Sequence, residues 1–128
     1  MAEACKVRVL LVDDHTIFRQ ALRRSLDSYP NIQVVGEAGN GEEALVQAES
    51  LQPNLVLMDI NMPKMDGIMA TRHLKRQFPD MLVVGVSFNA DGEYLTAMLE
   101  AGAVEVVTKE KAVEDLYEVI KKAITLER

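Results

Sequence analysis

The sequence predicts an α/β fold, in which an open sheet of five parallel strands carries helices on both faces. Short apolar runs alternate with helical patterns along the whole chain, and the connections between them are short. Parallel neighbours need crossover connections, which such helices supply. Of the 128 residues, 48% are apolar and 27% are charged, a composition typical of one compact domain.

Five apolar runs predict the strands. They lack strict alternation of apolar and polar residues, and Asp, Gly or Pro flanks them, as expected for strands that are buried on both faces. The predicted strands are Val7 to Val12, Ile32 to Val35, Leu55 to Met58, Leu82 to Val86 and Val104 to Val107.

Helical patterns fill the intervals between these runs. Asn40 and Asp66 are candidate N-caps of the second and third helices, because their side chains can accept a hydrogen bond from the first turn. Proline and glycine mark several helix ends. The predicted helices run from Ile17 to Leu26, from Asn40 to before Pro53, from Asp66 to about Gln77, from about Asp91 to Ala101, and over Val113 to Ile124.

This alternation favours a flavodoxin-like, doubly wound (βα)5 sandwich with strand order 2-1-3-4-5. No linker, repeat or low-complexity segment divides the chain, so we expect residues 1–128 to form a single domain.

Charge and composition exclude several function classes. The net charge of −6 repels phosphate backbones, so we expect no direct nucleic-acid binding by this domain. No apolar run is long enough to cross a membrane, and the first residues lack the pattern of a signal peptide. The single cysteine, Cys5, has no partner for an intramolecular disulfide. We therefore expect a cytoplasmic protein that does not bind membranes.

Polar residues gather at the predicted strand ends. Asp13 and Asp14 end the first strand, Asp59 the third and Ser87 the fourth, and Lys109 follows the fifth. In such sheets ligands bind at the carboxyl ends of the strands, so these side chains should meet at one edge. Three neighbouring carboxylates repel one another unless a cation neutralises them, and Mg2+ is the expected ion.

This set of groups suggests phosphoryl transfer to or from a carboxylate. An Asp can act as a nucleophile and form an acyl phosphate, and Asp59 on the central strand is the best candidate. Lys109 could hold a phosphoryl oxygen. The competing interpretation is structural, because Asp residues at strand ends often serve as helix N-caps.

The sequence resembles the receiver domain of bacterial two-component response regulators, and the NarL-type branch in particular, over nearly its whole length. Four segments carry the match: Leu11-Val12-Asp13-Asp14-His15, continuing to Arg19; Leu57-Met58-Asp59-Ile60-Asn61-Met62-Pro63-Lys64-Met65-Asp66-Gly67; Val86-Ser87; and Ala101-Gly102-Ala103, leading to Lys109. The second of these segments is long and specific.

The resemblance implies a role for each matching residue. Asp59 would accept the phosphoryl group and also bind Mg2+. The other oxygen ligands would be Asp14 directly, Asp13 through water, and the backbone carbonyl of Asn61. Ser87 and Lys109 would each contact a phosphoryl oxygen.

The resemblance also implies partners and an output. The donor would be a sensor histidine kinase or a phosphotransfer protein, and phosphorylation would favour a homodimer. The output would be transcription, controlled through a C-terminal helix-turn-helix that this chain does not contain. Such a protein would catalyse its own phosphorylation and dephosphorylation without being a turnover enzyme.

Two positions depart from the family pattern. Val106 stands where the family usually has an aromatic switch residue, and Phe88 stands where it prefers a small residue. Neither departure removes a group that phosphorylation needs. Both bear on signal transmission and on the lifetime of the phosphorylated state.

Other functions remain open at this stage. One is a magnesium-dependent phosphatase with an aspartyl-phosphate intermediate, although Asn61 cannot serve as its acid or base. Others are a stand-alone receiver or phosphorelay protein, and a pseudo-receiver that signals by binding alone. A dinucleotide site at Gly39 to Ala44 is disfavoured, because Glu42 and Glu43 occupy the place of the pyrophosphate.

Overall fold

The computed structural model describes residues 6–62, 65–88 and 92–126. Strands and helices alternate throughout, and the sheet has the predicted order β2-β1-β3-β4-β5 with all pairs parallel. The predicted fold class is confirmed. The elements are β1 (Val7–Val12), α1 (Thr16–Leu26), β2 (Ile32–Ala38), α2 (Gly41–Leu51), β3 (Leu55–Asp59), α3 (Gly67–Gln77), β4 (Leu82–Ser87), α4 (Gly92–Ala101), β5 (Glu105–Thr108) and α5 (Lys109–Leu126).

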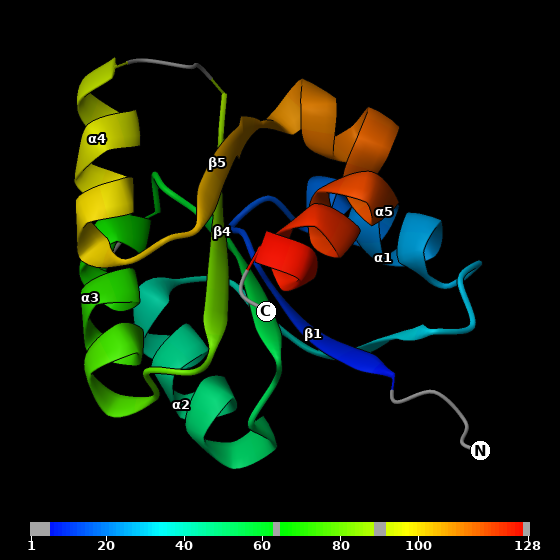
Figure 1. The fold of residues 1–128 in the computed structure, drawn as a ribbon, viewed down its shortest axis with the longest axis horizontal. Coiled ribbons are helices and arrows are strands. Elements are labelled where there is room, and N and C mark those ends of the chain that lie inside the picture. The colour runs from blue at the N-terminus through cyan, green and yellow to red at the C-terminus, as the bar shows by residue number, and fades with distance from the viewer. Residues whose placement is uncertain (1–5, 63–64, 89–91, 127–128) are drawn as a thin grey trace.

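Two helical layers cover the sheet. Helices α1 and α5 lie on one face, and α2, α3 and α4 lie on the other (Figure 1). Successive residues of a strand point to opposite faces of the sheet and so belong to different apolar cores. Leu11 and Leu57 belong to the core under α1 and α5, whereas Leu10 and Met58 belong to the core under α2, α3 and α4. All four are almost fully buried, as expected for strands covered on both faces.

The predicted N-caps are confirmed for two helices. The Asn40 side chain accepts a hydrogen bond from the backbone N–H of Glu43, and the Asp66 side chain accepts one from Met69. Helix α1 begins differently, since its N-cap is His15 and no side chain caps it. Asp13 and Asp14 therefore do not cap α1, and the N-cap interpretation of this pair is wrong.

Some boundaries differ from the prediction. Strand β2 continues to Ala38, three residues beyond the predicted end at Val35, where the register with β1 shifts. Helix α5 begins at Lys109, directly after β5 and four residues before the predicted Val113. The predicted start of the fourth helix at Asp91 lies outside the described residues.

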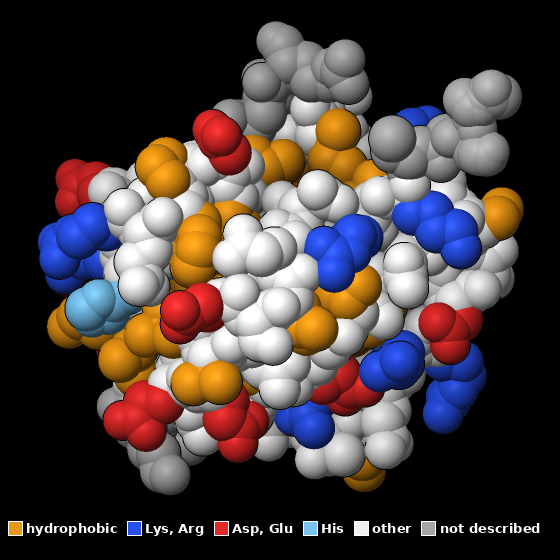
Figure 2. All heavy atoms as spheres, turned by 90° about the horizontal axis from the view of Figure 1, so that it is seen from below, with side chains coloured by type: hydrophobic (Ala, Val, Ile, Leu, Met, Phe, Trp, Pro, Cys, Tyr) orange, Lys and Arg blue, Asp and Glu red, His pale blue; other side chains and the backbone are white. Residues whose placement is uncertain are grey.

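No described helix is long and apolar enough to cross a membrane. The face seen from below in Figure 1 carries Lys and Arg side chains together with Asp and Glu side chains (Figure 2).

Candidate functional site

The predicted carboxylates meet at the carboxyl edge of the sheet. Asp13 and Asp14 follow β1, and Asp59 ends the neighbouring strand β3. One ligand atom from each of these carboxylates and from His15 lies within 4.8 Å of the others. We call Asp13, Asp14 and Asp59 the acidic cluster. The structure thus brings together the three carboxylates that the sequence predicts, and adds an imidazole.

Lys109 extends from the first turn of α5 into this cluster. Its ammonium nitrogen lies 2.9 Å from Asp13 Oδ2 and 3.6 Å from Asp59 Oδ2. The rings of Phe18 and Phe88 lie on the same ammonium, with centroids 4.7 and 4.3 Å away. The Lys109 residue is only 5% exposed, so its charge acts on the cluster with little screening by water.

Asp59 is the carboxylate with the most perturbed environment. It is 2% exposed, and its Oδ2 atom has no hydrogen-bond partner among the described residues. Its Oδ1 atom accepts a hydrogen bond of 3.3 Å from the backbone N–H of Asn61. Burial, and then the negative charge of Asp13, raise the pKa of Asp59 to about 7, and the positive charge of Lys109 opposes this shift.

These features fit a divalent cation. A buried carboxylate oxygen without a hydrogen bond is costly, and a cation held between the carboxylates would remove both the cost and the repulsion. Carboxylate oxygens are the ligands that Mg2+ prefers. Asp14 is exposed, so one side of the cluster remains open to water and to an incoming ion.

Ser87 and Asn61 flank the acidic cluster. Ser87 is the last residue of β4 and is 3% exposed; it follows Val86, which pairs with Asp59 in the sheet. The backbone of Asn61 already contacts the Asp59 carboxylate, which places this loop beside the cluster. Both predicted residues therefore lie at the edge where the carboxylates meet.

Gly67 lets α3 start directly against the end of β3. A Cβ atom at this position would collide with the backbone carbonyl of Asp59. The Gly67 N–H also donates to the carbonyl of Ile60, and Asp66 caps the helix. The Asp66-Gly67 pair thus packs the start of α3 against the backbone of Asp59 and Ile60 at the end of β3.

Two residues near the cluster had no assigned role in the sequence analysis. Arg19 donates to the backbone carbonyl of Asp13 and forms an ion pair with Glu37 at 2.8 Å. This contact with Arg19, together with Arg23, lowers the pKa of Glu37. His15 Nδ1 lies 3.1 Å from Asp13 Oδ1 and 3.2 Å from Asp14 Oδ1. His15 belongs to the first of the matching segments and adjoins the Asp pair, which were the sequence signals for its position.

The two departures from the family pattern have different surroundings. Phe88 is 64% exposed and contacts Lys109 and, edge to face, the ring of His15. It stands beside the cluster at the surface. Val106 is partly buried against the core under α2, α3 and α4, where it fills space beside Gly85.

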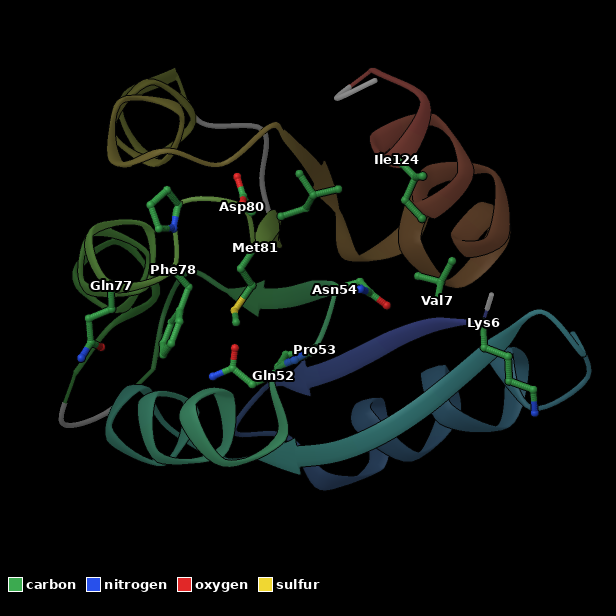
Figure 3. Close-up of a pocket in the computed structure, with 12 residues that line it drawn as sticks. Lys6, Val7, Gln52, Pro53, Asn54, Gln77, Phe78, Asp80, Met81 and Ile124 are labelled. Atoms are coloured by element: carbon green, nitrogen blue, oxygen red, sulfur yellow. The ribbon is translucent and has the colours of Figure 1, made fainter. Parts of the chain in front are cut away.

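Two hollows flank different ends of the sheet. One of about 590 Å3 adjoins the acidic cluster, and its lining includes Ile17, Phe88 and Val113. A larger one of about 880 Å3 lies at the amino ends of β1, β3 and β4, where the side chains of Phe78 and Met81 extend into it (Figure 3). None of its lining residues belongs to the acidic cluster, so only the smaller hollow bears on the chemistry there.

Comparison with known proteins adds a family match. The model of the response regulator receiver domain matches residues 9–121. The transcriptional regulatory protein DegU of Brevibacillus brevis is 38% identical over 116 residues, which cover 91% of this chain and 49% of that protein. The response regulator GacA of Pseudomonas protegens is 41% identical over 115 residues, covering 90% and 54%. The chain spans about half the length of these curated relatives.

Solved structures of response regulators are also similar to this chain. The crystal structure of a two-component response regulator of the LuxR family from Aurantimonas sp. has a TM-score of 0.88 at 32% identity, covering 96% of this chain and 87% of that one. The response regulator domain of Thermotoga maritima CheB has a TM-score of 0.86 at 32% identity, covering 94% and 97%. A protein-glutamate methylesterase of Alkalilimnicola ehrlichii is 45% identical over 106 residues, which are 27% of its length.

Proposed function

Because this chain belongs to the receiver domain family of two-component response regulators, we propose that it accepts a phosphoryl group on Asp59 and thereby controls an output. The observation that carries the proposal is the Asp59 Oδ2 atom, which is buried, has no hydrogen-bond partner among the described residues and lies 3.6 Å from the Lys109 ammonium. Residues 1–128 form one receiver domain in this proposal, and we assign no output activity to them.

Asp13, Asp14, Asp59 and the Asn61 carbonyl are the proposed ligands of Mg2+. The ion would supply charge neutralisation for the phosphoryl oxygens, as divalent ions do in phosphoryl transfer. Asp14 would bind it directly and Asp13 through water. The support for this assignment is that one carboxylate oxygen from each of Asp13, Asp14 and Asp59 lies within 4.8 Å of the others.

The remaining chemistry falls to the chain itself. Asp59 Oδ2 attacks the phosphorus of a phosphohistidine, forming a P–O bond while the P–N bond breaks. The leaving imidazole takes up a proton. Lys109 and the Ser87 hydroxyl hold two phosphoryl oxygens, so that the charge of the transferred group is balanced where it develops. Lys109 would shift from Asp13 towards the phosphoryl group in that state.

Slow loss of the phosphoryl group is a second reaction, in which water attacks the phosphorus, the P–O bond to Asp59 breaks, and inorganic phosphate and the free carboxylate are formed. The chain would therefore phosphorylate and dephosphorylate itself and would not turn over a substrate. The methylesterase named among the relatives matches over only 27% of its length, so its name carries no such activity to this chain.

The proposed phosphodonor is a sensor histidine kinase or a phosphotransfer protein, which would dock on α1 beside the acidic cluster. Ile17 is 83% exposed and Val113 is 50% exposed, and both line the hollow of about 590 Å3 next to Phe88. Exposed apolar side chains around such a site are typical of a protein interface. We also propose a cytoplasmic location and homodimer formation upon phosphorylation.

A labelling experiment tests the proposal. The native chain, incubated with Mg2+ and a small phosphodonor, should gain one phosphoryl group in its intact mass. Asp59→Asn should gain none, and a chelator should prevent labelling of the native chain. Asp80→Asn is the matched control, because Asp80 is exposed and lines the hollow at the opposite end of the sheet. Equal labelling of Asp59→Asn would disprove the assignment.

A further inference from the structure

We propose that His15 Nδ1 extends the acidic cluster into a mixed nitrogen and oxygen site, which binds Zn2+ more tightly than Mg2+. The inference rests on the metal site of the proposed function and adds a residue and a class of ion to it. Its consequence is that Zn2+ and similar nitrogen-preferring ions compete with Mg2+ for the acidic cluster.

The spacing of the ligand atoms supports this site. His15 Nδ1 lies 3.1 Å from Asp13 Oδ1 and 3.2 Å from Asp14 Oδ1. An ion with tetrahedral bonds of about 2.0–2.1 Å separates its ligand atoms by roughly 3.3 Å. Each of the two oxygen atoms therefore lies from Nδ1 at about the distance that separates neighbouring ligands of one ion, and the three residues each offer one ligand atom within 4.8 Å of the others.

The backbone and the ring of His15 each make a contact that favours its position beside the Asp pair. Its backbone N–H donates to Asp13 Oδ1 at 2.7 Å, which fixes the residue beside the Asp pair. Its ring meets Phe88 edge to face, with centroids 5.8 Å apart. A metal-binding imidazole whose orientation is fixed in advance loses less side-chain freedom when the ion binds.

The surroundings of Nδ1 also point to a cation. The nitrogen faces two carboxylate oxygens, which would accept its proton, and the Lys109 ammonium at 3.3 Å, which would donate to its lone pair. One tautomer cannot satisfy both. A divalent ion between the carboxylates and Nδ1 would bind the nitrogen lone pair and one oxygen of each carboxylate together. The buried Asp59 Oδ2, for which the described part of the chain supplies no hydrogen bond, is a further acceptor at the same place.

The donor set decides which ion is preferred. Mg2+ is a hard ion that takes oxygen ligands in octahedral geometry and gains little from an imidazole. Zn2+ accepts imidazole nitrogen together with carboxylate oxygen and tolerates four ligands. The His15 side chain is 52% exposed and that of Asp14 is 29% exposed, so an ion can enter from solvent.

Paired histidine variants test the proposal. The chain has two histidines, and His73 on α3 is the matched control. All proteins carry Cys5→Ser, so that the thiol does not bind Zn2+. His15→Gln should weaken Zn2+ binding, measured by competition with a zinc indicator, by about tenfold or more. The same variant should change Mg2+ affinity less than about twofold, whereas His73→Gln should change neither. Equal Zn2+ affinity in His15→Gln and its parent would overturn the proposal.

A second measurement needs no histidine variant. In the 15N-labelled Cys5→Ser protein, Zn2+ should shift the Nδ1 resonance of one histidine strongly and that of the other little. Assignment of the shifted ring to His73, or no shift in either ring, would overturn the proposal even if His15→Gln failed to fold. Phosphoryl addition to Asp59 with Mg2+ alone is measured in parallel. If the Cys5→Ser protein gained no phosphoryl group, this would count against the proposed function. The Zn2+ result would then be judged separately.

Discussion

Replacing Asp59 by Asn should stabilise the metal-free protein, and the gain should grow with pH. Burial and the charge of Asp13 raise the pKa of Asp59 to about 7 in the fold, from an ordinary value of 3.8. The folded state therefore holds a proton that the unfolded chain has released, across the pH range between these two values. Stability must fall as pH rises through this window.

The size of the effect follows from the shift. At pH ~8 the raised pKa of Asp59 lowers the free energy of unfolding by roughly 4 kcal/mol, and at pH ~5 by roughly 2 kcal/mol. An Asn side chain keeps the acceptor that Asn61 N–H uses and carries no charge. The advantage of Asp59→Asn over the native chain should thus increase by about 2 to 3 kcal/mol from pH ~5 to pH ~8.

Urea unfolding in the presence of a chelator, at a series of pH values, measures this advantage. Asp80→Asn provides the comparison, since Asp80 is exposed and remote from the cluster. Saturating Mg2+ should shrink the advantage, because an ion neutralises the charge that Asn removes. An advantage that is constant with pH, or one that Asp80→Asn shares, would refute the electrostatic account of the acidic cluster.

Three further substitutions have definite expected outcomes. Asp14→Asn should raise the melting temperature of the metal-free protein, by less than Asp59→Asn because the Asp14 side chain is 29% exposed, and should abolish phosphoryl addition; a clear fall in melting temperature would contradict the repulsion described here. Phe88→Ala should speed the loss of phosphate from the labelled protein severalfold, since its ring lies over Lys109 at the edge of the site; an unchanged rate would show that Phe88 does not shield the acyl phosphate. Ile17→Glu should slow transfer from a kinase and leave labelling by a small phosphodonor intact, and loss of both would indicate misfolding.

The sequence was sufficient to predict the sheet order and the meeting of the carboxylates. Both follow from apolar runs that end in polar residues, because the carboxyl ends of parallel strands share one edge. The end of β2 was missed, since Glu37 interrupts the apolar pattern. In the structure Arg19 and Arg23 form ion pairs with the Glu37 carboxylate, which neutralises its charge inside β2.

Side-chain environments were less accessible to sequence reasoning. Ile17 fits the apolar spacing of α1, yet it is 83% exposed and does not belong to the core under α1 and α5. The contacts of Lys109 with Phe18 and Phe88 join three segments distant in sequence. No local pattern encodes such a contact. The same holds for the pKa of Asp59, which depends on burial.

Chemical trapping of the phosphorylated residue tests the central claim most directly. The native chain is labelled by a small phosphodonor with Mg2+, and the acyl phosphate is reduced with borohydride, which converts a phosphorylated aspartate to homoserine. Peptide mapping should then find homoserine at position 59 and at no other aspartate. Homoserine at position 13 or 14, or no conversion in a chain that has gained a phosphoryl group, would contradict the assignment of Asp59 as the acceptor.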